Sequence, residues 1–166
     1  MNPTELPPIS ELIPHRSPVV LLDGVLKHDG ESTTARVAVD RQTWLKRENG
    51  SVAAWVALEY MAQCIATHEG IRAHLEGRPP VHGSLASATG VRLHRSCFEP
   101  GKLLRVRAQH VRGRPGLGVI SHFCTVHEGS EAGEGQLLAE GRLSISISKP
   151  SPPDAGVSPL RQSSSR

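Results

Sequence analysis

The sequence Trp-Val-Ala-Leu-Glu-Tyr-Met-Ala-Gln, residues 55–63, forms the centre of a long apolar segment and carries one acid, Glu59. Across residues 52–76 the apolar side chains recur at the spacing of one helical face, namely Ala54, Leu58, Met61, Ala62 and Ile65. A second face holds mostly small residues, interrupted by Glu59 and Gln63. A surface helix would be more polar, so we expect a helix that other elements cover on nearly all sides.

The start of this helix is predicted near Val52, because Asn49-Gly50-Ser51 can form a turn and an N-cap just before it. Glu59 would then lie among apolar walls. Desolvation favours the neutral form of a carboxyl group, so such a glutamate keeps a proton available near neutral pH.

Strands are predicted on both sides of the helix from alternating apolar residues and from turn residues between the segments. The expected strands cover residues 19–27, 33–39, 81–94, 104–109, 117–126 and 136–148. Two strands, one long helix and four further strands predict an α+β fold in which a curved antiparallel sheet wraps around the central helix.

One globular domain is expected over residues 12–148, preceded by an N-terminal arm over residues 1–11. Residues 149–166 are rich in Pro, Ser and Gly with few apolar side chains, which predicts a disordered tail.

Composition excludes several classes of protein. The three cysteines are odd in number and widely spaced, which argues against a disulfide framework and for a reducing compartment. A net charge of +3 without an aromatic stacking platform does not indicate nucleic-acid binding. No export signal or membrane-spanning segment is apparent, so we expect a cytoplasmic protein without membrane contact.

Two segments resemble one known family. Residues 12–23, Leu-Ile-Pro-His-Arg-Ser-Pro-Val-Val-Leu-Leu-Asp, resemble the opening of the hot-dog-fold 3-hydroxyacyl-[acyl-carrier-protein] dehydratases. Residues 58–63 are similar to the signature in which that family's catalytic carboxylate sits on the central helix. Residues 55–63 look most like the dehydratase-like group of the aryl polyene pathway, and the likeness extends over about residues 12–148. The resemblance implies a hot-dog fold.

The family's usual catalytic histidine has no counterpart in this sequence. Standard members carry a His-Phe-Pro-Gly motif before the helix, but fourteen places before Glu59 stands Leu45. No histidine occurs between His28 and His68. Either another histidine supplies the base, or the chain has kept the binding tunnel and lost the chemistry.

Dehydration of a 3-hydroxyacyl thioester requires a base for the α-proton, an acid for the departing hydroxyl and donors for the thioester carbonyl. We assign the acid to Glu59 and the base to His15, which lies inside the matched opening segment; His82 is the reserve candidate. His15 and Glu59 each have a purely structural alternative.

Substrate contacts are expected from Gln63, which lies one helical turn after Glu59 and can orient its carboxyl or the substrate hydroxyl. The alternative is an amide that only satisfies backbone groups. Free backbone amides at the helix start, near Val52 and Ala53, would face the carbonyl oxygen. No cofactor is expected, because the resemblance implies a substrate carried on the phosphopantetheine of an acyl carrier protein.

Basic residues after the helix provide a candidate docking surface for that acidic carrier, represented by Arg92, Arg95 and Arg105. A solvated strand face is the alternative. No metal site is expected: within the segment containing His122, Cys124 and His127, the third side chain points away from the other two.

The sequence therefore predicts a dehydratase of carrier-bound 3-hydroxyacyl thioesters, in fatty-acid-like or aryl polyene assembly. A homodimer, or a heterodimer with a related hot-dog subunit, is implied by the family. Two alternatives remain open: a thioester hydrolase of the same fold, and a non-catalytic subunit that binds acyl chains or supports an active partner.

Overall fold

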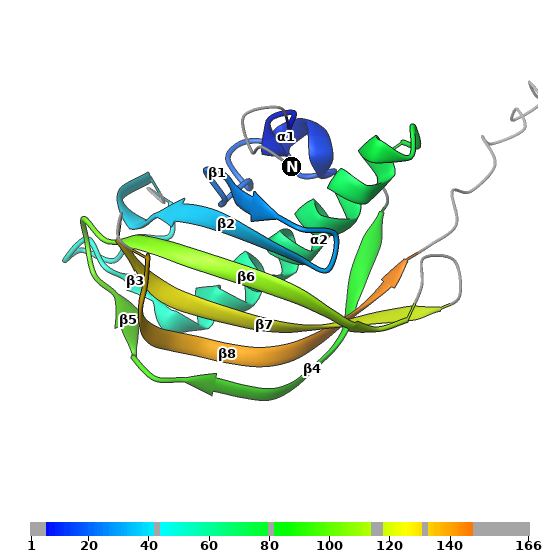
Figure 1. Ribbon diagram of the computed structural model, residues 1–166. Helices are drawn as coiled ribbons and strands as arrows, with labels where there is room; N and C mark the ends of the chain where they lie inside the picture. Colours follow the sequence, from blue (N-terminus) through cyan, green and yellow to red (C-terminus); the bar gives the residue numbers. More distant parts are fainter. Residues whose placement is uncertain (1–5, 42–43, 80–81, 114–117, 131–132, 148–166) are drawn as a thin grey trace, which may run out of the picture.

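The computed structural model of the chain describes residues 6–41, 44–79, 82–113, 118–130 and 133–147 (Figure 1). Two helices, eight strands and two short 3-10 turns follow one another in these ranges. In chain order they are α1 (Ile9–Leu12), β1 (Gly24–His28), β2 (Ser32–Ala38), η2 (Val39–Arg41), β3 (Val52–Ala53), η3 (Ala54–Val56), α2 (Ala57–Leu75), β4 (Gly83–Leu93), β5 (Cys97–Phe98), β6 (Leu103–Arg112), β7 (Val119–Ser130) and β8 (Gly133–Ile147). The expected tail over residues 149–166 lies outside the described residues.

Six strands form one antiparallel sheet in the order β1-β2-β6-β7-β8-β4. Figure 1 shows this sheet curving around α2, with α1 lying against the helix on the side away from β8. The predicted α+β architecture is therefore confirmed, and each of the six expected strands has its counterpart. The first strand begins later than expected, at Gly24 rather than Val19.

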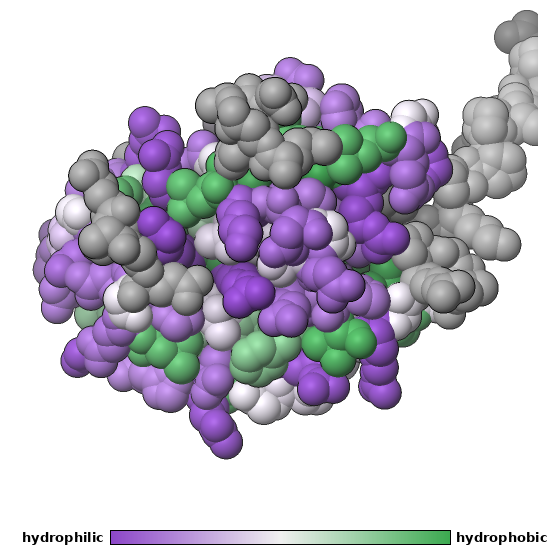
Figure 2. Space-filling model, in the orientation of Figure 1, coloured by the Kyte–Doolittle hydropathy of each residue, from purple (hydrophilic) through white to green (hydrophobic). Residues whose placement is uncertain are grey.

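The core lies between α2 and the concave face of the sheet. In β6, Leu104, Val106 and Ala108 are buried, while the intervening Arg105 and Arg107 remain partly exposed. This alternation follows from the two-residue period of a strand, so every second side chain faces the helix. Hydrophilic side chains cover much of the face seen in Figure 2, and apolar ones appear there as separate patches.

The helix begins at Ala57 rather than near Val52. Val52 and Ala53 instead pair with Phe98 and Cys97 in the two-stranded β3–β5 sheet, and the 3-10 turn η3 leads from this sheet into α2. The Asn49 side chain accepts hydrogen bonds from the Ser51 backbone and hydroxyl, so it stabilises a turn before β3 and not the helix. The far end is as expected, with α2 ending at Leu75 before Gly77 at φ +65°.

Helix α1 packs directly on the backbone of α2 at Gly70. A Cβ atom at position 70 would overlap the carbonyl oxygen of Leu12, the last residue of α1. The absence of a side chain at Gly70 therefore permits the contact that holds the N-terminal segment on the helix.

Gly70→Ala should lower the free energy of unfolding by about 1–3 kcal/mol, because the added methyl group displaces α1 from its packed position. The matched control is Gly24→Ala, where a Cβ meets nothing within 4 Å, and its change should stay within about 0.5 kcal/mol. Urea denaturation followed by circular dichroism measures both. Equal stabilities of the two variants would contradict the close packing of α1 on α2.

Candidate active site

A groove of about 150 Å³ runs along one side of α2. Its helical wall comes from positions three or four residues apart, which place their side chains on one face. The N-terminal segment and strands β4 and β8 supply the other walls. The lining residues are Pro14, His15, Glu59, Ala62, Ile65, Ala66, Glu69, Gly83, Leu85 and Ile145.

The structure brings His15 and Glu59 together in this groove. His15 Nε2 lies 3.9 Å from Glu59 Oε1, and the two side chains are 32% and 44% exposed. The distance is too long for a direct hydrogen bond. His15 Nδ1 is buried and has no hydrogen-bond partner among the described residues. The pair therefore presents a basic nitrogen and a carboxyl oxygen to the same space.

Glu59 is more accessible than the sequence suggested. The apolar pattern around it predicted enclosure by walls, but the carboxyl side chain lies at the edge of the groove in this single chain. The groove is bordered by β4, an edge strand of the sheet, whose outer edge pairs with no other described strand. The expected enclosure is therefore incomplete within one chain.

Gln63 positions the Glu59 carboxyl and is itself fully buried. Its Nε2 donates 2.8 Å hydrogen bonds to Glu59 Oε1 and to the carbonyl oxygen of Val19, while its Oε1 accepts one of 2.8 Å from the Leu21 backbone. Gln63 therefore contacts the Glu59 carboxyl, as its position one turn later in the helix allows. The amide is engaged at both ends, so it holds the site in place and does not line the groove.

Arg16 fixes the segment that carries His15. One guanidinium nitrogen, Nη1, donates to the carbonyl oxygens of Ser10, Ile13 and His15 at 3.1, 2.9 and 2.8 Å. These bonds connect the end of α1 to the turn beside the groove. The imidazole therefore projects from an anchored backbone.

Val52 and Ala53 do not supply the expected free helix amides. Both are buried in β3, ahead of the helix, and neither lines the groove. At the actual start of α2, the Ala57 N–H already bonds to the carbonyl oxygens of Ala54 and Trp55. Val52 and Ala53 therefore lack the free helix-terminal amides that would bind the thioester carbonyl.

Position 45 and His82 are less well placed than His15 to supply the catalytic base. Leu45, where the family's histidine would stand, is partly buried and packs against the core. His82 is exposed and precedes Gly83, which lines the groove, but the His82 side chain is not part of that lining.

The three candidate docking arginines do not form one cluster. Arg92 lies on β4 and pairs with Glu140 at 3.5 Å, and Arg95 donates to the Gln136 side chain at 2.8 Å. Arg105 lies on β6, separated from β4 by β7 and β8 in the sheet. Of the three, Arg92 lies on the edge strand β4 and Arg95 lies just after it.

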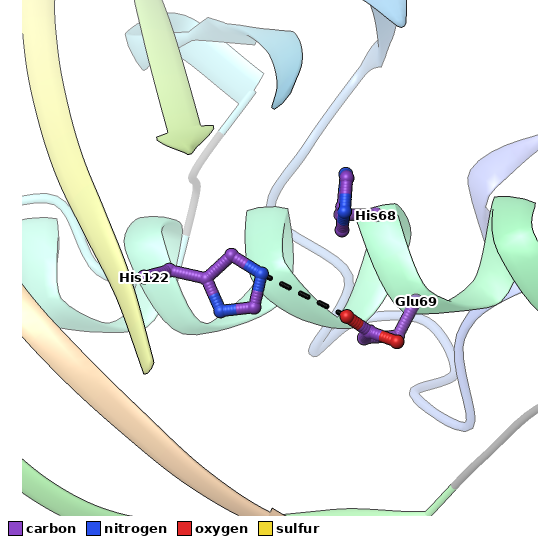
Figure 3. Close-up of side chains that lie close together, drawn as sticks. All are labelled: His68, Glu69 and His122. Atoms are coloured by element: carbon purple, nitrogen blue, oxygen red, sulfur yellow. Dashed lines mark ion pairs between the residues drawn. The ribbon is translucent and has the colours of Figure 1, made fainter. Parts of the chain in front are cut away.

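Sequence reasoning missed a buried polar cluster formed by His68, Glu69 and His122 (Figure 3). His122 had been compared only with Cys124 and His127, its neighbours along the same strand. The adjacent His-Glu pair within an apolar helix was a signal that could have indicated a further polar site.

Comparisons with known proteins identify the family. A family model described as ApeP-like, ApeP dehydratase, matches residues 7–155. The chain belongs to the ApeP-like dehydratase family. No curated protein matches the sequence.

Solved structures show that this ApeP-like chain has the hot-dog fold. The dehydratase heterocomplex ApeI:P from Xenorhabdus doucetiae superposes with a TM-score of 0.80 at 22% identity, covering 88% of this chain and 94% of that one. Zebra fish thioesterase superfamily member 2 gives a TM-score of 0.58 at 14% identity, with 81% and 88% of the two chains covered. The phenylacetic acid degradation protein PaaI from Thermus thermophilus gives 0.53 at 14% identity, with 74% and 90% covered.

Neither described helix of this ApeP-like chain has the length and apolar character needed to cross a lipid bilayer.

Gln63→Leu should destabilise the chain by about 1–3 kcal/mol, because the buried Leu21 N–H and Val19 carbonyl lose their side-chain partner. Gln109→Leu is the matched control, since Gln109 is an exposed residue of β6, and it should change stability by no more than about 0.5 kcal/mol. Urea unfolding measures the difference. A Gln63→Leu protein as stable as the wild type would show that these bonds do not anchor the N-terminal segment.

Proposed function

We propose that this ApeP-like chain dehydrates 3-hydroxyacyl thioesters carried on an acyl carrier protein, with Glu59 as the acid and His15 as the base. The pathway is fatty-acid-like or aryl polyene assembly, as the family match suggests. The observation that carries this proposal is the 3.9 Å separation of His15 Nε2 and Glu59 Oε1 at one groove.

Such a separation suits an elimination across two neighbouring carbon atoms. The α-proton and the 3-hydroxyl sit on adjacent carbons, so the base and the acid must lie within a few Å of each other. In the proposed step the His15 imidazole accepts the α-proton, and the Glu59 carboxyl donates a proton to the hydroxyl, which leaves as water. The products are water and a 2-enoyl thioester. Proton transfer from the His15 imidazolium to the Glu59 carboxylate then restores both groups.

The remaining groove residues fit an acyl chain. Beyond the polar pair the groove continues along Ala62, Ile65 and Ala66 of α2 toward Glu69, and Leu85 and Ile145 provide apolar contacts from the sheet. Apolar walls favour binding of a hydrocarbon chain by removing its surface from water. The thioester end would then lie near His15 and Glu59.

The carrier protein would dock near Arg92 and Arg95, because these cations lie on and just after β4, the strand that also forms one wall of the groove. Carrier proteins are acidic, and complementary charge promotes their encounter with a basic surface. Arg105 lies on another part of the sheet and is a weaker candidate for the same contact.

A second hot-dog subunit would complete the groove. Strand β4 has eleven residues, and within the described part of the chain it pairs only with β8. Its Leu85 is 47% exposed although it lines the groove, and Trp55, four residues before Glu59, is 63% exposed. An uncovered edge with apolar side chains is a common site for pairing with another chain. The ApeI:P neighbour, a heterocomplex by name, favours a related subunit as the occupant.

A mass measurement on a 3-hydroxyacyl-carrier protein tests the reaction. Loss of one water from the acyl-carrier mass is the expected result, and His15→Ala and Glu59→Gln should each lower the rate by roughly 10²–10⁴-fold. His82→Ala is the matched control and should leave the rate unchanged, because His82 does not line the groove. Full activity of His15→Ala would contradict the assignment of the base.

The same spectrum separates the alternatives. Loss of the whole acyl group would indicate a thioester hydrolase, the activity named for several proteins of this fold. An unchanged carrier, both for the chain alone and with a second hot-dog subunit, would indicate a non-catalytic protein.

Light scattering tests the proposed assembly. We expect a complex of two subunits when the chain is produced together with a related hot-dog subunit, because pairing at β4 and coverage of Trp55 bury apolar surface. A chain that stays monomeric both alone and with that subunit would contradict the proposal that a neighbour closes the groove.

A further inference from the structure

A buried polar cluster joins the C-terminal half of α2 to the sheet. His68 and Glu69 come from α2, and His122 comes from β7 (Figure 3). All three residues are buried, with 0%, 5% and 0% exposure. In Figure 3 the His122 ring and the Glu69 carboxyl point toward one another, and His68 lies beside them.

Several polar atoms of this cluster have no hydrogen-bond partner within the described ranges. They are His68 Nε2, Glu69 Oε1 and both ring nitrogens of His122. A buried polar atom without a partner destabilises a fold by about 1–3 kcal/mol, so such a concentration of them calls for a ligand. A cation can satisfy one atom of each residue, since it accepts lone pairs from imidazole and carboxylate together.

The geometry points to a site for one divalent transition-metal ion, best suited to Zn²⁺, bound by His68, Glu69 and His122. Two imidazoles and one carboxylate are a donor set that Zn²⁺ uses with a fourth position left for water. One candidate ligand atom from each residue lies within 4.8 Å of the others, and His122 Nε2 is 3.7 Å from Glu69 Oε1. Bound ligands around Zn²⁺ are separated by roughly 3.3 Å, given bonds of about 2.0 Å. A small inward movement of the side chains therefore completes the site.

Neighbouring residues orient the His68 imidazole for metal binding. Its Nδ1 lies 3.0 Å from the Thr33 hydroxyl, which also lies 2.8 Å from His28 Nδ1. If Thr33 donates to His28, it accepts the Nδ1 proton of His68, and the lone pair then remains on the unpartnered Nε2. Metal-bound histidines are typically oriented by such a contact at the second ring nitrogen.

Arg72 holds the Glu69 carboxyl in the orientation that the site requires. The Arg72 guanidinium pairs at 3.5 Å with Glu69 Oε2, which leaves Oε1 on the side of His122.

The groove borders the cluster at Glu69, which is one of its lining residues. A metal ion could approach from this side, and a water molecule from the groove would occupy the fourth position. The ion would join α2 to β7 beyond the apolar part of the groove. This inference does not depend on the proposed dehydration.

Cobalt binding to the untagged full chain tests the site. After chelator treatment and dialysis, titration with Co²⁺ should give visible d–d bands that saturate at one ion per chain, and Zn²⁺ should abolish them. Zn²⁺ should also raise the thermal unfolding midpoint, because an ion that binds only the folded chain stabilises it.

Four variants assign the ligands. Glu69→Gln keeps the side-chain shape and His122→Phe keeps a ring in the core, so both should fold and lose the saturable bands. Thr33→Val should weaken Zn²⁺ binding by roughly 10–100-fold, as loss of an orienting partner does. His74→Gln, an exposed position on the same helix, should bind as the wild type does. Circular dichroism confirms folding of each variant.

Three results would overturn the proposal. One is a wild-type chain that gives no saturable bands with Co²⁺. Another is unchanged binding by the folded Glu69→Gln protein. The third is a thiolate-to-cobalt charge-transfer band, which would place the ion on a cysteine such as Cys124.

Discussion

The buried amide of Gln63 is the contact on which the site depends. It is the only described side chain seen to bond both to Glu59 and to the N-terminal segment, through the Val19 carbonyl and the Leu21 N–H. Because an amide has a donor and an acceptor end, it satisfies both backbone groups and still orients the carboxyl. The distance between His15 and Glu59 is therefore set by a helix residue and not by a flexible loop. Gly70 and Arg16 reinforce this arrangement from the side of α1.

Most of the fold could be predicted because apolar periodicity is a strong local signal. The two-residue alternation at Leu104, Val106 and Ala108 and the helical recurrence through Met61 and Ile65 each describe a face that must be buried. The helix start could not be predicted in the same way. Val52 and Ala53 are equally apolar in a strand or a helix, and their pairing with β5 depends on residues more than forty positions away.

Residues of the candidate site could be proposed where the sequence carried a motif, and not where their placement depended on packing. Glu59 and His15 were identified from their matched segments, and the structure places both at one groove. The exposure of Glu59 was not predictable, because an apolar helix does not reveal which neighbour covers it. The cluster of His68, Glu69 and His122 joins residues over fifty positions apart, and only the curvature of the sheet around α2 brings them together.

The unpaired outer edge of strand β4 also affects how the chain behaves in a cell. The eleven residues of this strand present a row of backbone donors and acceptors along the outer edge. None of the other described strands pairs with this edge. Any extended peptide can use such an edge as a template. If a second subunit pairs at β4 as proposed, a chain made in excess of that subunit would expose both this edge and Trp55 to other newly made proteins. Balanced synthesis of the two proposed subunits would then protect the cell from that association as well as complete the groove.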